Sequence, residues 1–135
     1  MRKRLLQTGL AVALIATACG DSGNGGLTVG ELTGRWKAGG LTFLEFSEDG
    51  TYRIALTDNF TNSTVDQGQF TLDGTLFTFI SNENSTACDA GQRGNYEVEV
   101  LEKGTSGVDR LIQVQSEDEC STRGSTGDLT LVRLS

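Results

Sequence analysis

The chain has 135 residues, with 18 acidic against 11 basic side chains, three cysteines and no histidine or proline. Histidine is the usual general base and the commonest zinc ligand, so its absence argues against hydrolase triads and zinc sites. The chain also lacks a Gly-x-Ser-x-Gly elbow and a phosphate-binding glycine loop. Because an acidic surface repels phosphate backbones, nucleic acid is not an expected partner. We expect no enzyme activity, no catalytic residues, no cofactor and no metal.

Residues 1–18 have the layout of a bacterial export signal. A positive start, Met-Arg-Lys-Arg, precedes an apolar run over residues 5–18, which is shorter than the about 20 residues that span a membrane. The small residues 16–18, Ala-Thr-Ala, stand directly before Cys19 and resemble a lipobox, where signal peptidase cuts before a cysteine that carries a diacylglyceryl group. The resemblance implies that Cys19 is the lipidated first residue of the mature protein. The alternative is an ordinary signal peptide cleaved nearby, which would leave an unpaired cysteine.

Residues 19–26 connect this cysteine to the rest of the chain. After Cys19 the segment reads Gly-Asp-Ser-Gly-Asn-Gly-Gly, which is typical of a flexible linker with a reach of roughly 15 Å. A lipid on Cys19 would therefore hold the following domain, residues 27–135, close to a membrane of the cell envelope. In a cell with two membranes, the lipoprotein resemblance implies the outer membrane, facing the periplasm, because the residue after the cysteine is not acidic. The mature chain keeps 8 basic and 18 acidic residues, which gives it a net charge of −10.

Residues 27–135 are about the size of one domain, and their apolar residues alternate with polar ones at a period of two. The predicted strands are 35–37 with 41–46, 51–57, 67–72, 75–81, 95–101, 110–116 and 128–134. Asp-Gly pairs at 49–50 and 73–74 lie between apolar runs and predict hairpins, so neighbouring strands should pair in sequence order. We therefore expect an all-β fold: a small antiparallel up-and-down β-barrel of seven or eight strands.

The two remaining cysteines lie in segments without strand patterning. Cys88 belongs to a polar segment over residues 82–93 and Cys120 to another over residues 117–127, which we interpret as loops at the barrel ends. In the oxidising cell envelope such a pair predicts a disulfide, and the absence of histidine makes a metal site the weaker alternative. Three adjacent acids at 117–119 could bind calcium in principle, but they lack the alternating spacing of a calcium loop.

The start of the domain carries a family resemblance. Residues 31–36, Glu-Leu-Thr-Gly-Arg-Trp, contain a Gly-x-Trp signature that resembles the first strand of lipocalins. Further matches are Leu-Glu-Phe at 44–46, Gly-Gln-Phe at 68–70, Gly-Asn-Tyr at 94–96, Asp-Glu-Cys at 118–120 and an arginine in the last strand. Over most of residues 27–135 the chain is similar to bacterial lipocalin-like lipoprotein domains. The resemblance implies that Gly34 and Trp36 belong to the closed end of the barrel, where Trp36 packs on Arg133.

The inward-facing side chains decide whether such a barrel has room for a ligand. The candidates to line a pocket are Leu44, Phe46, Tyr52, Ile54, Phe70, Tyr96 and Val98, together with Leu76 and Ile112. Phe60, Phe77 and Phe79 are expected to face outward. Because large residues dominate the inward set, we expect a filled barrel with at most a shallow, open-ended cleft.

These patterns favour a non-catalytic binding or interaction module that is anchored to a membrane by its lipid. One alternative is a carrier of a small hydrophobic ligand. Another is an inhibitor of an envelope lysozyme or protease, since the chain resembles small disulfide-bonded barrel lipoproteins with that role and its acidic surface suits a basic enzyme. An enzyme that acts through a pair of carboxylates is the least favoured class, because 18 acids make chance pairs easy.

Overall fold

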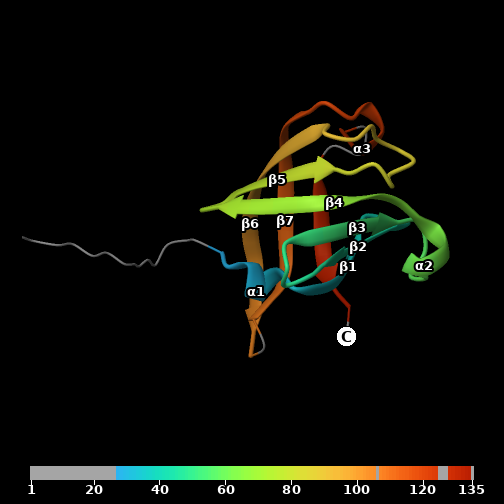
Figure 1. Cartoon of the computed structure of the whole chain (residues 1–135). Coiled ribbons are helices and arrows are strands. Elements are labelled where there is room, and N and C mark those ends of the chain that lie inside the picture. The colour runs from blue at the N-terminus through green and yellow to red at the C-terminus, as the bar shows by residue number, and fades with distance from the viewer. Residues whose placement is uncertain (1–26, 106, 125–127, 135) are drawn as a thin grey trace, which may run out of the picture.

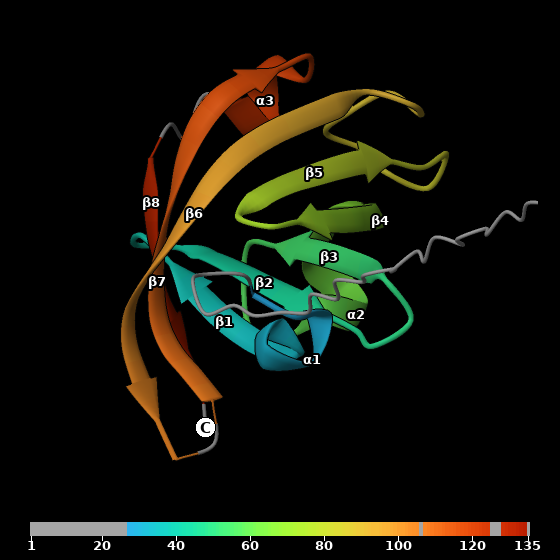
Figure 2. The same ribbon diagram turned by 90° about the vertical axis from the view of Figure 1, so that its left-hand side faces the viewer.

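The structure, a computed structural model, describes residues 27–105, 107–124 and 128–134; the predicted signal, the linker and Cys19 lie outside this part of the chain. Within it, strands β1 to β8 form one closed antiparallel barrel in sequence order (Figure 1, Figure 2). This architecture confirms the predicted all-β, up-and-down barrel. Among the described residues, no helix is long and apolar enough to cross a membrane.

The elements follow one another through short connections. In chain order they are α1 (Val29–Leu32), β1 (Gly34–Ala38), β2 (Thr42–Phe46), β3 (Thr51–Ala55), α2 (Phe60–Ser63), β4 (Thr64–Asp73), β5 (Leu76–Ser81), β6 (Arg93–Gly104), β7 (Gly107–Asp118), α3 (Ser121–Gly124) and β8 (Leu129–Arg133). Each strand pairs with the next, and β1 closes the barrel by pairing with β8, where Trp36 lies opposite Arg133. The hairpin of β6 and β7, the longest strands, extends past α1 at one end of the barrel (Figure 1).

The two Asp-Gly pairs make the tight turns that the sequence predicts. Gly50 lies between β2 and β3 with a φ of +86°, and Gly74 lies between β4 and β5 with a φ of +65°. Glycine adopts such positive φ values readily because it has no Cβ. The turns also fix the strand register, since Phe46 pairs with Tyr52 across the first hairpin. Both residues then point into the barrel and are buried.

An aromatic cluster fills the middle of the barrel. Phe77 and Phe79 of β5 stack with their ring centroids 5.0 Å apart, and the ring of Phe46 lies 5.1 Å from that of Phe77. Three more rings contact this group: Phe70, Tyr52 and Tyr96. Aromatic pairs at these separations add to the hydrophobic stabilisation of the core. Little interior volume therefore remains at this level of the barrel.

The expectation that Phe77 and Phe79 face outward is wrong. Both faces of β5 are apolar, because Leu76 and Ile80 alternate with the two phenylalanines. The aromatic side chains take the interior, where they bury the larger apolar area. Leu76, which the sequence pattern assigned to the interior, lies on the outer face and is 36% exposed.

A second correction concerns β7. Leu111 and Gln113 face inward and are buried, so Ile112 between them lies on the outer face and does not line the interior. The sequence 111–114 is Leu-Ile-Gln-Val. One face therefore begins with Leu111 and the other with Ile112, so both faces begin with an apolar residue. Alternation alone cannot separate the two faces there, and the strand buries a glutamine that looks like a surface residue.

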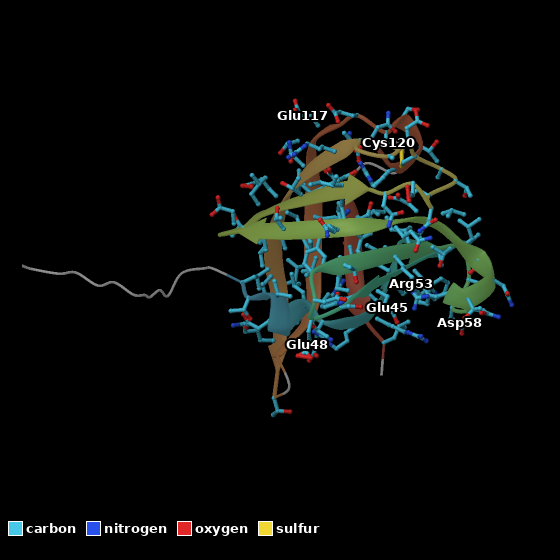
Figure 3. All side chains as sticks on the ribbon, viewed as in Figure 1. Glu45, Glu48, Arg53, Asp58, Glu117 and Cys120 are labelled. Atoms are coloured by element: carbon cyan, nitrogen blue, oxygen red, sulfur yellow. A yellow bond between two sulfur atoms is a disulfide. The ribbon has the colours of Figure 1, made fainter. Side chains whose placement is uncertain are left out.

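Phe60 is buried as well, but on the outside of the barrel wall. It is the first residue of α2, and the guanidinium groups of Arg35 and Arg53 lie 5.0 and 5.3 Å from its ring centroid. Both arginines form ion pairs with Glu45, and Figure 3 shows Glu45 and Arg53 side by side on the outer face near α2. Phe60 therefore lies outside the barrel as expected, but these cationic side chains cover its ring, so it gives a partner no exposed aromatic surface.

One end of the barrel closes around Trp36. Its ring is fully buried, and its Nε1 donates a hydrogen bond to the Leu32 carbonyl of α1 at 2.8 Å. The guanidinium of Arg133 lies 4.4 Å from the ring centroid and donates to the Thr33 and Val108 carbonyls, each at 2.7 Å. Trp36 and Arg133 therefore stack as the sequence resemblance implied, and they seal this end between α1, β1, β7 and β8.

Candidate functional site

The end of the barrel opposite Trp36 contains a cavity of about 210 Å³. It is bounded by the starts of β2, β4 and β8, by the end of β3 and by α3. Its lining residues are Thr42, Leu44, Ile54, Leu56, Val65, Asp66, Phe79, Ala87, Tyr96, Gln113, Thr122, Arg123 and Leu129. Leu56 is 56% exposed, so the cavity reaches solvent at this end of the barrel. The wall is mainly apolar and includes one carboxylate, one guanidinium and one amide.

Three of the residues predicted to line a pocket meet at this cavity: Leu44, Ile54 and Tyr96. The other four pack in the core away from it: Phe46, Tyr52, Phe70 and Val98. The cavity volume lies below the about 300 Å³ of a usual ligand pocket. That result follows from the aromatic cluster, which fills the barrel interior next to the cavity.

Arg123 of α3 is the centre of a buried polar network beside the cavity. Its Nη1 donates to Asp66 Oδ2 at 3.0 Å, to Ser81 Oγ at 2.8 Å and to the Tyr52 hydroxyl at 3.1 Å. Its Nε donates to Asp118 Oδ2 at 2.7 Å. The network therefore joins α3 to strands β3, β4, β5 and β7. Sequence reasoning placed Tyr52 inside the barrel but missed the network, because Asp66, Ser81, Asp118 and Arg123 look like solvated side chains in their own segments.

Burial sets the protonation states of this network. Burial raises the pKa of Tyr52 and of Tyr96 well above the ordinary value, and the Asp118 carboxylate next to Tyr96 raises the pKa of that hydroxyl further. Burial alone would lower the pKa of Arg123, but contact with Asp118 and the nearby charge of Asp66 raise it overall. At neutral pH both hydroxyls are neutral and the guanidinium is charged.

The predicted disulfide is confirmed: Cys88 and Cys120 are bonded, with their Cα atoms 5.4 Å apart. It joins the segment between β5 and β6 to the residue just before α3, and Figure 3 shows Cys120 at the end of the barrel where α3 lies. Cys120 also accepts a hydrogen bond at its Sγ from the Arg123 backbone N–H at 3.4 Å. Ala87 and Arg123, neighbours of the two cysteines, both line the cavity. The disulfide therefore holds two parts of the cavity wall together.

The acids at 117–119, considered above for calcium, do not act as a unit. The Asp118 side chain is fully buried against Arg123, whereas Glu119 is exposed and accepts from the Arg93 backbone N–H at 2.7 Å. Glu117 is exposed on the upper outer edge of the barrel in the view of Figure 3. Among the described residues no three acidic or cysteine side chains are grouped so that they could hold a metal ion.

Two glutamines of β7 keep a polar atom buried without a hydrogen-bond partner in the described part of the chain: Oε1 of Gln113 and Oε1 of Gln115. Gln113 lines the cavity and Gln115 does not. A buried unsatisfied oxygen costs about 1–3 kcal/mol. Gln113 therefore adds an amide to the cavity wall that the predicted lining did not include, while its Oε1 is itself shielded from the cavity space.

Comparison with protein-family models, with curated proteins and with solved structures finds no match to this chain. The similarity to lipocalins therefore stays a prediction from the sequence. The geometry described above stands independently of it.

Proposed function

We propose that this protein is a non-catalytic binding module of the bacterial cell envelope, tethered to a membrane by a lipid on Cys19 and binding its partner at the open end of its barrel. The observation that carries this proposal is the cavity of about 210 Å³, which reaches solvent beside the exposed side chain of Leu56. The mainly apolar wall of the cavity continues to the rim at Leu56, which gives an apolar partner group a surface to cover.

The cavity volume favours one kind of partner over another. A drug-sized ligand occupies about 300 Å³ or more, so it would not fit wholly inside. A single side chain or the end of a short chain would fit. The proposal is therefore an interaction module that receives a small protruding group; a carrier that encloses its ligand is the less supported alternative.

Two leucines that differ in position provide the test of the binding surface. Leu56 lines the cavity, whereas Leu76 lies on the outer face of β5 and is also exposed. The mature protein with its disulfide intact, immobilised and incubated with envelope extract, should recover a partner as wild type and as Leu76→Asp. Leu56→Asp should lose it, because a charge at the rim opposes apolar contact. Equal recovery by all three variants would place the binding surface elsewhere.

The tether is tested separately. Metabolic labelling with a fatty-acid probe should tag the wild-type protein and leave Cys19→Ser untagged, and the variant should leave the membrane fraction. A labelled, membrane-bound Cys19→Ser protein would refute the lipid anchor and leave the binding surface to be judged on its own.

A further inference from the structure

The mouth of the cavity carries the most exposed large apolar side chains of the described part of the chain. These are Leu41, which is 78% exposed, and Leu56, which is 56% exposed. Leu56 lines the cavity, and Leu41 directly precedes Thr42, which lines it too. Because Phe43 of β2 pairs with Ala55 of β3, Leu41 and Leu56 follow this pair at the same end of the barrel. The apolar surface of the cavity therefore continues outward onto two leucines.

The charged residues of the cavity wall are already paired with each other. Asp66 and Arg123 supply one charge of each sign, and they form an ion pair at 3.0 Å. Asp66 also accepts from the hydroxyls of Tyr52 and Ser81, and the Nε, Nη1 and Nη2 groups of Arg123 all donate hydrogen bonds. The wall therefore holds no net charge that would attract a charged group into the cavity.

The rest of the wall selects an uncharged aliphatic group. Leu44, Ile54, Val65 and Leu129 give aliphatic contact, and the ring of Phe79 also lines the space. A charged group that entered would lose its hydration among these side chains, which is strongly unfavourable. At about 30 Å³ for each heavy atom, the volume that one water takes in the liquid, 210 Å³ holds about seven such atoms. One leucine, isoleucine or methionine side chain therefore fits inside.

Acidic side chains flank the mouth. Asp58 follows Leu56 by two residues, Asp128 directly precedes Leu129, and both aspartates are exposed. Two residues of extended chain span at most about 7 Å, and at physiological ionic strength charges act over about 8 Å. No basic residue lies within two positions of Leu56 or Leu129 in the sequence. The mouth should therefore attract cationic side chains of a partner and repel anionic lipid headgroups.

We propose that the open end of the barrel binds a basic protein segment, which places one aliphatic side chain in the cavity and flanking lysine or arginine side chains beside Asp58 and Asp128. This inference rests on the proposed function, because it assumes that the open end is the binding surface. A protein segment is favoured over a membrane lipid, because an acyl chain is longer than the cavity and would leave most of its length in water. The net charge of −10 on the mature chain, from 8 basic and 18 acidic residues, attracts basic proteins as well.

A titration with short peptides, followed by amide NMR shifts at physiological ionic strength, tests the inference. The protein is the mature chain as Cys19→Ser with its disulfide intact; all eight strands lie within residues 34–133, so the barrel is unchanged. The probe is the end-blocked peptide Lys-Lys-Leu-Lys-Lys. One control peptide has serine in place of the leucine, and another has glutamate in place of every lysine.

We expect saturable binding of the probe, with shifts at the amides of Leu56 and Leu129. The serine peptide should bind at least tenfold more weakly, because it leaves the cavity unfilled. The glutamate peptide should show no saturable binding, because its charge has the same sign as the mouth. Hexanol, an aliphatic group without flanking charges, should bind about fivefold more weakly than the probe.

Two pairs of acid-to-amide substitutions test the mouth itself. Asp58→Asn with Asp128→Asn should weaken probe binding about fivefold; the second substitution keeps a side-chain oxygen that can accept from the Gln115 backbone N–H. The control is Glu48→Gln with Asp73→Asn, which removes the same charge from exposed side chains at the other ends of β2 and β4 and should change binding less than twofold. Figure 3 shows Asp58 beside α2 and Glu48 near α1.

Several results would overturn the inference. Equal binding of the serine peptide would mean that the acidic surface attracts the probe without the cavity. Equal binding of the glutamate peptide, or unchanged binding by the Asp58 and Asp128 variant, would mean that the mouth does not select a basic partner, and tighter binding of hexanol would make a free alkyl chain the occupant. In these last cases shifts at Leu56 would still place binding at the open end, so the proposed function survives. If no compound binds, the inference fails, and the Leu56→Asp comparison decides the proposed function by itself.

Discussion

The closed end of the barrel offers a sharp test at Gly34, where an added methyl group would meet the guanidinium of Arg133. The residue has a φ of +128°, and a Cβ built on its backbone would lie 2.7 Å from Nη1 of Arg133. That Nη1 donates to the Thr33 carbonyl, and the guanidinium plane covers Trp36. Gly34→Ala must therefore strain the backbone and displace the arginine at once.

The expected loss of stability follows from these two contributions. A side-chain-bearing residue in this backbone region costs about 1–3 kcal/mol, and loss of one hydrogen bond from a charged donor costs about 1.5–3 kcal/mol. Gly34→Ala should therefore lower the free energy of unfolding by about 2.5–6 kcal/mol, measured by urea titration with Trp36 fluorescence. Gly40→Ala is the control, because a Cβ at Gly40 meets no atom within 4 Å. Equal effects of the two substitutions would refute the close approach of Gly34 and Arg133.

Three further predictions use the same unfolding assay, followed by circular dichroism where the tryptophan is replaced. Trp36→Ala should cost about 3–5 kcal/mol as a core truncation; loss of partner binding at unchanged stability would instead make Trp36 a binding residue. The double substitution Cys88→Ser with Cys120→Ser removes the link across a sequence separation of 32 residues, and the chain-entropy relation predicts that it lowers the free energy of unfolding by about 3.7 kcal/mol. Unchanged stability would mean that the disulfide is not formed in solution. Burial raises the pKa of Tyr52 and of Tyr96. The two hydroxyls therefore contribute fully to stability below about pH 10, and this contribution is lost as the pH rises further, because the tyrosines of the unfolded chain ionise at a lower pH than those of the folded barrel. Tyr52→Phe should flatten this decline, and a wild-type urea midpoint that stays constant from pH 9 to 11 would contradict it.

The sequence predicts the barrel well because its local signals agree with each other. Asp-Gly pairs at 49–50 and 73–74 mark turns whose glycines have positive φ, and strands with one apolar face, such as Thr51–Ala55, leave a single choice of register. Where both faces are apolar, as in β5, the choice depends on the volume available inside the barrel. That volume depends on the side chains of all eight strands together, so it cannot be predicted from the sequence of any one strand.

The polar side of the cavity was not predictable for a different reason. Asp66 comes one residue before the strand expected from alternation, and Arg123 lies in a polar segment whose composition is typical of a surface loop. Each becomes buried only because the other neutralises part of its charge across a sequence separation of 57 residues. Gln113 gave no usable signal either, because it alternates with Ile112 and Val114 and so looks like an outward-facing residue of β7.

Two arginines, one at each end of the barrel, explain why binding is expected at one end only. Arg133 finds its acceptors in backbone carbonyls and lies flat on Trp36, so a ligand at that end would have to break these contacts before it gained any of its own. Arg123 lies beside a cavity that already exists, so a partner group could enter there without breaking a contact of the barrel. Stability and binding should therefore respond to different substitutions: changes around Trp36 alter the free energy of unfolding, whereas Leu56→Asp alters partner binding in a barrel that stays folded, because Leu56 is exposed.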